Sequence, residues 1–274
     1  MSKLPKSYGP GTRAKKSLGQ NFLVDGRVRT KIVEAADISP TDTILEVGPG
    51  RGFLTKALAQ RAGRLVAVEL DDGLIPRLQE TFADSNNVEI VEGDARTVDI
   101  DCLAGTATDY KVVANLPYYA ATPIVRRFLE ATHKPTTLVV MVQKEVGLEM
   151  AAGPGKMGIL SVATQVYGSP RIVTSIPPKA FRPSPNVTSA VVRIDTYAEP
   201  AVKFDGPEKF FTLVRAGFSA PRKQIHNSLK NGLGIESKEI MALLRNAEIS
   251  ATRRAQTLSI KEWGNLYREY ASTL

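Results

Sequence analysis

The chain has 274 residues, of which 43% are hydrophobic and 23% are charged, an ordinary composition for a globular protein. No apolar run approaches the roughly 20 residues that span a bilayer, and the basic N-terminus lacks the apolar core of a signal peptide, so we expect a cytoplasmic protein. Cys102 is the single cysteine, which excludes an intramolecular disulfide, and with two histidines a Cys/His zinc site is disfavoured.

The net charge of +8 is concentrated at the two ends of the chain. Residues 1–30 hold seven Lys and Arg against one Asp, and residues 201–274 hold twelve against seven acids, whereas the stretch between them is mildly acidic. A polyanionic partner held by both ends fits this distribution. On charge alone, a basic tail with solvated helix faces fits it almost as well.

The predicted elements begin with a flexible arm at residues 1–16 and a short helix at 26–36, after which strands and helices alternate. Strands are predicted at Thr43–Val47, Leu65–Val68, Val88–Val91, Lys111–Ala114 and Leu138–Val142, with helices at 53–62, 72–83 and 122–131. This alternation predicts a mostly parallel sheet that is covered by helices on both faces. Two later runs, Ile159–Tyr167 and Ser189–Ile194, are strand-like and are expected to add antiparallel strands at one edge.

The last third of the chain is predicted to be a stiff loop, a linker and a helical domain. Ser175–Val187 holds four prolines, which exclude a helix. Residues 196–206 form the predicted linker, and helical patterns follow near 207–219, 222–231, 236–246 and 259–271. Ser259 and Glu262 have the spacing of a capping box at the start of the last helix. We therefore expect an arm at 1–25, an α/β domain at 26–198 and an all-helical domain at 205–274.

A glycine-rich turn, Glu46–Gly52, follows the first predicted strand of the sheet and opens a helix. Glycines let such a turn bend sharply and approach a ligand closely. Its G-x-G-x-G spacing differs from the common dinucleotide fingerprint, and a purely structural tight turn is the alternative. No Lys-Ser/Thr pair follows, which argues against a nucleoside-triphosphate loop.

Two acidic residues follow the next two strands. Glu69 lies about twenty residues after the glycine turn, where a carboxylate can accept hydrogen bonds from ribose hydroxyls. Asp94 ends the third strand, where it can hold the amino group of an adenine ring. Each acid alone is more often a solvated loop residue. Together, at the carboxyl ends of successive strands, they predict an adenosine-shaped crevice.

The fourth strand runs into Asn115-Leu116-Pro117-Tyr118. The lone pair of an adenine N6 amine is delocalised into the ring, and oxygen acceptors beside the amine can free it for attack. The Asn115 side chain and the Leu116 carbonyl are such acceptors, and Pro117 fixes the direction of that carbonyl. Tyr118 offers a ring to the target base. A sulfonium methyl is already activated, so this transfer requires no metal and no strong base and depends on alignment and electrostatics. As an isolated tetrapeptide, Asn-x-Pro is also a common turn.

Phe181 lies in the proline-stiffened stretch 180–187 and is a second aromatic candidate. A flipped base can be held between Phe181 and Tyr118, because aromatic stacking offsets part of the cost of extracting a base, ~1–3 kcal/mol per base. A core aromatic is an equally good interpretation of this residue.

The motifs together resemble the ribosomal RNA adenine dimethyltransferase family, from about Lys15 to Trp263. The matching segments are Leu18–Leu23, Glu46–Gly52, Asn115–Tyr118, Gln143–Val146, Phe181–Val187, and Arg222-Lys223 with Asn227 and Leu229. The resemblance implies a Rossmann-like fold dependent on S-adenosylmethionine (SAM), with a basic arm closing over the cofactor and a small helical RNA-binding domain. It also implies dimethylation of two adjacent adenosines near the 3′ end of 16S rRNA, in an immature small ribosomal subunit, by an enzyme without a metal. We expect a monomer that does not associate with a membrane.

The resemblance also implies roles for matching residues. The expected cofactor contacts are Asn21, Leu23, Gly48, Glu69, Asp94 and Asn115. The expected catalytic residues are Asn115, Leu116, Pro117, Tyr118 and Phe181. Arg222 and Lys223 are expected to contact RNA, although Pro221 stands where relatives often have another Arg. Other departures are Ala120 and Ala121, where relatives carry larger or polar residues, and a slightly shortened loop at 151–158.

Two alternative functions stay open from the sequence. One is a 23S rRNA adenine methyltransferase of the macrolide-resistance type, which shares the glycine turn and the Asn-Leu-Pro-Tyr type of motif. The Phe181 loop and the stretch 254–263 favour the 16S target over this one. The other is a largely structural factor for small-subunit assembly, against which the intact acceptor motif argues.

Overall fold

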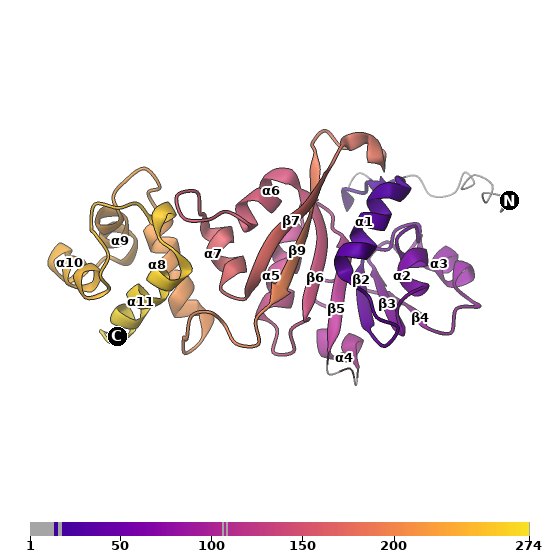
Figure 1. Cartoon of the computed structure of the whole chain (residues 1–274), viewed down its shortest axis with the longest axis horizontal. Coiled ribbons are helices and arrows are strands. Elements are labelled where there is room, and N and C mark those ends of the chain that lie inside the picture. Colours follow the sequence, from indigo (N-terminus) through magenta and orange to yellow (C-terminus); the bar gives the residue numbers. More distant parts are fainter. Residues whose placement is uncertain (1–13, 16–17, 106, 108, 274) are drawn as a thin grey trace.

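The computed structural model describes residues 14–15, 18–105, 107 and 109–273, and its centre is a seven-stranded sheet (Figure 1). Its strands are β2 (Thr43–Val47), β3 (Arg64–Glu69), β4 (Val88–Glu92), β5 (Tyr110–Asn115), β6 (Thr137–Gln143), β7 (Gly168–Ile176) and β9 (Ser189–Thr196). The strand order is β4-β3-β2-β5-β6-β9-β7. The first five strands pair in parallel, and β9 pairs antiparallel with β6 and β7. This confirms the mostly parallel sheet with an antiparallel edge.

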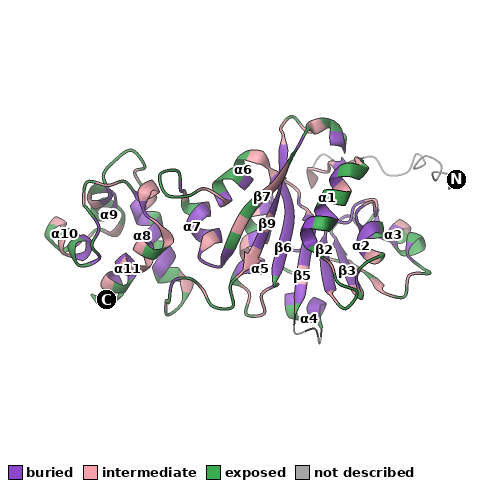
Figure 2. Cartoon of the chain, in the orientation of Figure 1, coloured by how far each residue is buried: buried purple, intermediate pink, exposed green. Residues whose placement is uncertain are grey.

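Helices cover both faces of this sheet because successive strand side chains point to opposite faces. The helices of this part are α1 (Gly26–Ala36), α2 (Thr55–Ala59), α3 (Ile75–Thr81), α4 (Ile100–Ala104), α5 (Ala121–Glu130), α6 (Lys144–Met150) and α7 (Ile159–Gln165). Leu45, Val112 and Val140 belong to a core shared with α4, α5 and α7. Ile44 and Val113, one residue along, belong to a second core shared with α1 and α2. Figure 2 shows the buried strands between these layers.

The predicted strand at Ile159–Tyr167 is wrong, because residues 159–165 form α7. Its β-branched residues favour a strand by propensity, but Val162, Ala163 and Val166 recur at helical spacing and are buried in the core. The Ser161 hydroxyl accepts from the Gly158 N–H at 2.9 Å and donates to the Glu149 carbonyl at 2.6 Å, which anchors the first turn. The antiparallel edge strand is instead β7. The four prolines of residues 175–187 all lie after β7 ends at Ile176.

A second, two-stranded sheet joins segments far apart in the sequence. Strand β1 (Phe22–Leu23) pairs antiparallel with β8 (Phe181–Arg182), which follows the short 3₁₀ helix η2 (Pro178–Ala180). The sequence predicted neither strand, since two residues carry no readable periodicity. The pairing fixes the N-terminal segment against the proline-rich loop. The arm predicted for residues 1–16 lies outside the described residues except for Ala14 and Lys15.

The C-terminal part consists of helices that surround the fully buried Trp263. They are α8 (Pro207–Phe218), α9 (Ile225–Leu233), α10 (Ser237–Asn246) and α11 (Ile260–Ala271), with the 3₁₀ helix η3 (Ala255–Thr257) before α11. The capping box is confirmed: the Ser259 N–H donates to Glu262 at 2.7 Å and the Glu262 N–H to Ser259 Oγ at 3.3 Å.

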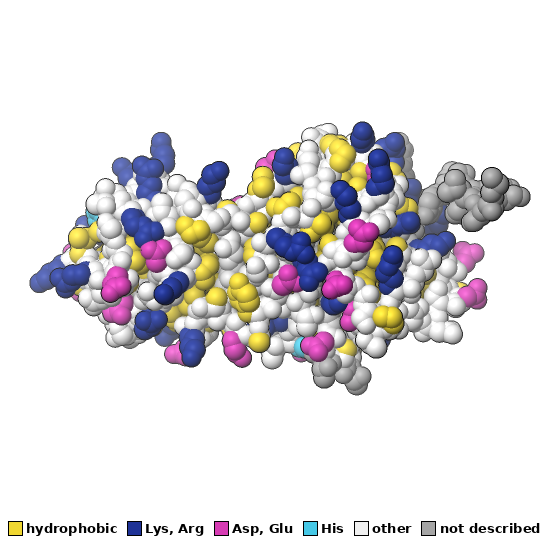
Figure 3. Space-filling model, in the orientation of Figure 1, with side chains coloured by type: hydrophobic (Ala, Val, Ile, Leu, Met, Phe, Trp, Pro, Cys, Tyr) yellow, Lys and Arg dark blue, Asp and Glu magenta, His cyan; other side chains and the backbone are white. Residues whose placement is uncertain are grey.

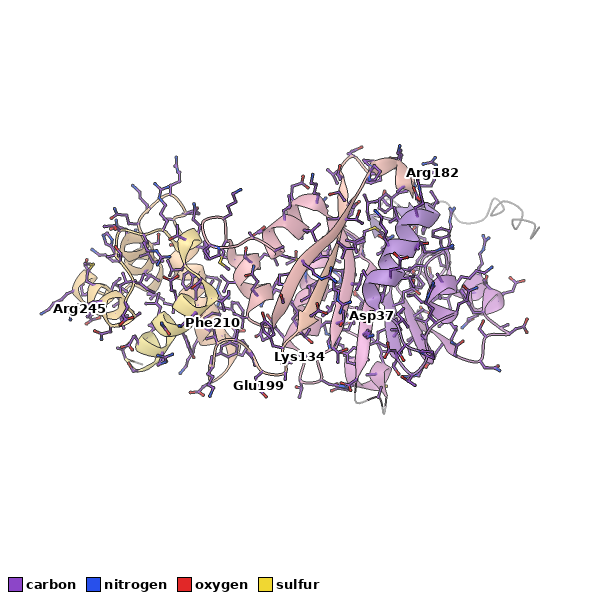
Figure 4. The ribbon with its side chains drawn as sticks, in the orientation of Figure 1. Asp37, Lys134, Arg182, Glu199, Phe210 and Arg245 are labelled. Carbon is purple, nitrogen blue, oxygen red and sulfur yellow. The ribbon has the colours of Figure 1, made fainter. Side chains whose placement is uncertain are left out.

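The core continues from the sheet part into these helices. The Tyr167 ring contacts Phe204 edge to face at 6.3 Å between centroids, and Phe204 stacks on Phe210 at 5.4 Å. Phe210 is fully buried, and Figure 4 marks its place in the helical part. The helical part is therefore packed, through a shared aromatic contact, on the turn between α7 and β7. The domain boundaries stay a prediction. In the part of the chain that the structure describes, none of the helices is both long and apolar enough to cross a bilayer.

Candidate active site

The carboxyl ends of the parallel strands open onto one cavity of about 780 Å³, counted with its open mouth. The edge of the sheet at the carboxyl ends of its strands is where ligands bind in such folds. It is lined by residues of the N-terminal segment, the glycine turn, the loops after β3 and β4, and the segment after β5. Asn21, Gly48, Glu69, Asp94 and the tetrapeptide Asn115–Tyr118 all line it. The structure therefore brings together most of the predicted site residues.

The glycine turn lines the cavity with Gly48 and Gly50. Its backbone has the positive φ angles that favour glycine. Gly48 and Gly50 have φ angles of +69° and +58°. A Cβ on Gly50 would lie 3.0 Å from the Phe22 ring, so a larger residue would displace the N-terminal segment. The Gly48 N–H donates to the Val68 carbonyl at 2.9 Å, which ties the turn to β3. The turn is thus held by the sheet in a conformation that lets a ligand approach its backbone closely.

Glu69 is buried, and each of its carboxylate oxygens holds one backbone N–H. One oxygen accepts from Gly50 at 2.9 Å and the other accepts from Asp71 at 2.9 Å. Burial raises the pKa of Glu69. Each oxygen keeps a second lone pair. Glu69 therefore fixes the glycine turn and still has acceptor capacity toward the cavity.

Asp94 is held by Arg96, which the sequence interpretation missed. The guanidinium contacts both carboxylate oxygens at 2.6–3.0 Å, and the Arg96 N–H donates to Asp94 at 2.8 Å. These hydrogen bonds hold the pKa of Asp94 below its usual range. Asp94 is therefore an ionised acceptor at the cavity wall. Its spacing of two residues from Arg96 is common in loops and gives no signal by itself.

Asn115 connects the acceptor motif to the N-terminal segment. Its side-chain nitrogen donates to the Asn21 carbonyl at 3.1 Å, and the Asn21 side chain donates to the Gly19 carbonyl at 3.0 Å. The Leu116 N–H donates to the Met141 carbonyl at 3.2 Å, which continues the β5–β6 ladder. The amide nitrogen of Asn115 is thus engaged, and its amide oxygen is the atom left to accept from a ligand.

A hydrogen bond of the Tyr118 hydroxyl orients its ring. Its hydroxyl lies 2.7 Å from Oγ of Ser189, which is fully buried at the start of β9. The next residue, Tyr119, is 51% exposed and stands at the mouth of the cavity, close to Gly19. Arg96 lies over the Tyr119 ring at 6.0 Å. Neither Ser189 nor Tyr119 was predicted, because their roles depend on contacts between distant segments.

Phe181 lies away from the cavity, in a different place from the one that the sequence predicted. Its side chain is 1% exposed, lies in the core with Leu23 and α1, and does not line the cavity. Alternation along β8 directs Phe181 inward and leaves Arg182 exposed, as Figure 4 shows for Arg182. The structure therefore does not place Phe181 opposite Tyr118 as the second face of a base sandwich.

A second hollow adjoins the cavity across the glycine turn. It is lined by Leu23, Glu46, Arg51 and Asn115 among others, so Leu23 faces this hollow instead of the main cavity. Glu46 is 1% exposed, and within the described residues its Oε2 has no hydrogen-bond partner. Burial, with the nearby Glu69 carboxylate adding to it, raises the pKa of Glu46 to about 8. A buried carboxyl with one oxygen left without a hydrogen-bond partner is a suitable neighbour for a cationic group.

We predict that Glu46→Gln changes the pH dependence of stability. The pKa of Glu46 is about 8 in the folded protein and 4.5 ordinarily. Its contribution to stability is therefore present below about pH 4.5 and is lost as the pH rises through 8. In the absence of donor, the parent should therefore lose stability between pH 6 and pH 8 that Glu46→Gln keeps. The free energy of unfolding of Glu46→Gln minus that of the parent should rise by ~2–3 kcal/mol over this range. Denaturant unfolding at both pH values measures this, and parallel pH profiles for the two proteins would contradict it.

The comparisons with known proteins agree with this site. The chain is 46% identical over 259 residues to a ribosomal RNA small subunit methyltransferase A of Dehalococcoides mccartyi (strain CBDB1), covering 94% of this chain and 89% of the relative. A dimethyladenosine transferase from Plasmodium falciparum superposes with a TM-score of 0.81 at 22% identity, over 92% of this chain and 98% of that one, which shows the fold alone. The 23S rRNA methyltransferase ErmE superposes with a TM-score of 0.73 at 27% identity, over 91% and 99%.

The fold and the cavity define a Rossmann-like methyltransferase that uses SAM. Residues 11–266 match the family described as ribosomal RNA adenine dimethylase, and the chain belongs to that family. It is therefore an enzyme that methylates adenine in ribosomal RNA.

Proposed function

We propose that this enzyme dimethylates N6 of two adjacent adenosines near the 3′ end of 16S rRNA, within an immature small ribosomal subunit. The observation that carries this proposal is a cavity that joins the glycine turn to all four residues of the Asn115–Tyr118 motif. The small-subunit target is supported by the 46% identity to a small subunit methyltransferase, against 27% to ErmE. Because the rRNA substrate is made and assembled in the cytoplasm of bacteria, we also propose a cytoplasmic location.

The residues around the cavity fit SAM. The glycine turn offers a backbone that a ligand can approach closely, and Glu69 and Asp94 offer acceptors for ribose hydroxyls and an adenine amine. Asn21 brings the N-terminal segment to the cavity, and Leu23 lines the adjoining hollow. The buried Glu46 carboxyl, which lines the same hollow, suits the ammonium end of the donor. When bound, SAM supplies a methyl group that is activated by its positively charged sulfur.

The chain's own contribution to transfer is to shape and orient the target amine. The Asn115 amide oxygen and the Leu116 carbonyl accept hydrogen bonds from the N6 hydrogens, which draws the nitrogen lone pair out of the purine ring. Pro117 carries no N–H and keeps the preceding carbonyl direction fixed. Tyr118, held by Ser189, offers its ring to the extruded base. Tyr119, exposed at the mouth, is a candidate for the second aromatic face, because Phe181 does not line the cavity.

The RNA is held, in this proposal, by basic side chains outside the cavity. Arg222 and Lys223 are exposed in the turn between α8 and α9. Lysines and arginines are spread over the C-terminal helices, at the left of Figure 3. Such side chains neutralise phosphates and release counterions, independent of sequence. We propose that these two residues contact the rRNA backbone and that the enzyme acts as a monomer.

Mass spectrometry of rRNA fragments tests the target. Small subunits from cells lacking this protein should acquire dimethyladenosine at two adjacent positions near the 3′ end of 16S rRNA when incubated with the enzyme and SAM. 23S rRNA treated in the same way should acquire none, and Asn115→Ala serves as the inactive control. Methylation of 23S rRNA instead would identify the macrolide-resistance type of activity.

A cellular comparison separates catalysis from assembly. A strain without the protein and a strain carrying only Asn115→Ala are compared for their profiles of immature small subunits. Equal defects would assign the role to catalysis. A defect confined to the strain without the protein would favour the assembly factor.

A further inference from the structure

The N-terminal strap, defined here as residues 18–22, lies along the cavity and contributes every one of its residues to the lining. We infer that the buried carboxylate of Asp71 is a positioning group that fastens this strap, so that donor binding and strap closure form one equilibrium. The inference rests on the proposed donor site and assigns a role to residues outside it. Asp71 itself does not line the cavity.

Asp71 accepts hydrogen bonds from two side chains, that of Gln20 in the strap and that of Lys15 just before it. It is 3% exposed. One oxygen accepts from the Lys15 ammonium at 2.6 Å, and the other accepts from the Gln20 side-chain amide at 2.7 Å. The Gln20 amide oxygen accepts in turn from the Lys15 N–H at 2.8 Å. The three residues, called the clasp below, thus form a closed ring of hydrogen bonds around one buried charge.

The clasp is connected to both halves of the active site. The Asp71 N–H donates to Glu69, the acceptor assigned to ribose, at 2.9 Å. At the other end of the strap, the Asn21 carbonyl accepts from Asn115, the acceptor assigned to the target amine, at 3.1 Å. Opening the strap would therefore remove one wall of the cavity and one partner of Asn115. The apparent dissociation constant of the donor equals its intrinsic value divided by the fraction of molecules with the strap closed, so it rises when that fraction falls.

The chemistry of the clasp makes Asp71→Asn a sharp test. An asparagine amide must turn its NH₂ toward either the Lys15 ammonium or the Gln20 NH₂, so a donor meets a donor in either orientation. The adjacent Asp72 provides a matched control, because it also accepts from Lys15, at 3.2 Å, but is 78% exposed. An exposed pair of this kind contributes little.

Binding of S-adenosylhomocysteine, measured by calorimetry on the full chain, reports the equilibrium between the open and the closed strap. Asp71→Asn should raise the dissociation constant about tenfold, whereas Asp72→Asn should stay within about twofold of the parent. Hydrogen exchange of the Leu18–Phe22 amides should quicken in Asp71→Asn and slow again when the ligand saturates it. With saturating donor, kcat should stay within about twofold while the donor KM rises, a split that simple loss of folded protein does not produce.

Lys15→Met gives a second route, because Lys15 lies outside the strap and its side chain is half exposed, so that its loss does not disturb the core. It should weaken ligand binding less than Asp71→Asn does, and the double variant should be weaker by less than the product of the two effects. Parent-like binding by Asp71→Asn, equal effects of Asp71→Asn and Asp72→Asn, or independent effects in the double variant would each overturn the inference. The calorimetry and hydrogen-exchange assays contain no RNA, so a failed search for the rRNA target leaves their result unchanged.

Discussion

Asn115→Ala is expected to lower methyl transfer at saturating donor and RNA by at least about 10²-fold, a loss typical of removing one group that acts on the transition state. The Asn115 amide oxygen is the side-chain acceptor placed where β5 ends, and alanine offers none. Donor affinity should fall by no more than about tenfold, because only the hydrogen bond to the Asn21 carbonyl is lost from the cavity wall. Single-turnover methylation and calorimetry with S-adenosylhomocysteine separate the two effects.

Asn115→Asp is the informative companion variant. It retains an acceptor oxygen but loses the N–H that reaches the Asn21 carbonyl, and it places a negative charge beside that carbonyl. Donor affinity should therefore suffer more than in Asn115→Ala, while part of the transfer rate at saturating donor should return. Full activity of Asn115→Ala would remove the acceptor assignment, and so would an Asp variant as inactive as the Ala variant.

The parallel sheet and its ligand edge were predictable because their signals are local. Each strand is a short apolar run, each is followed by a turn, and parallel strands bring their carboxyl ends to one edge. Gly48, Glu69, Asp94 and Asn115 were therefore placed in one cavity from position alone. The Ser259 capping box was predictable for the same reason, since both partners lie within one helical turn.

The errors occurred where long-range contacts decide the outcome. Residues 159–165 have strand propensity but are helical because the core beneath α5 accommodates a helix there. Phe181 was weighed equally as a base-stacking and a core residue, and pairing of β8 with β1 placed it in the core. The Tyr118–Ser189 contact spans 71 residues and the Gln20–Asp71 contact spans 51, so no local pattern announces either.

Glu69→Ala should weaken donor binding by about 100-fold, the largest expected loss of affinity. The carboxylate makes two hydrogen bonds to backbone N–H groups, at Gly50 and Asp71, and bonds to a charged acceptor contribute ~1.5–3 kcal/mol each. Removing it releases the glycine turn, leaves those N–H groups without their acceptor and deletes the proposed ribose contact. Because Glu69 holds Asp71 in place, the clasp should loosen as well.

Glu92→Ala is the matched control for this effect. Glu92 pairs in register with Glu69 on the neighbouring strand β4, at the same edge of the sheet, but it is exposed and does not line the cavity. Its removal changes the net charge as Glu69→Ala does, so a purely electrostatic effect on the donor would appear in both variants. Calorimetry with S-adenosylhomocysteine should show a loss of about twofold or less for Glu92→Ala. Similar losses in the two variants would mean that charge at this edge, and not the carboxylate that fastens the glycine turn, determines donor affinity.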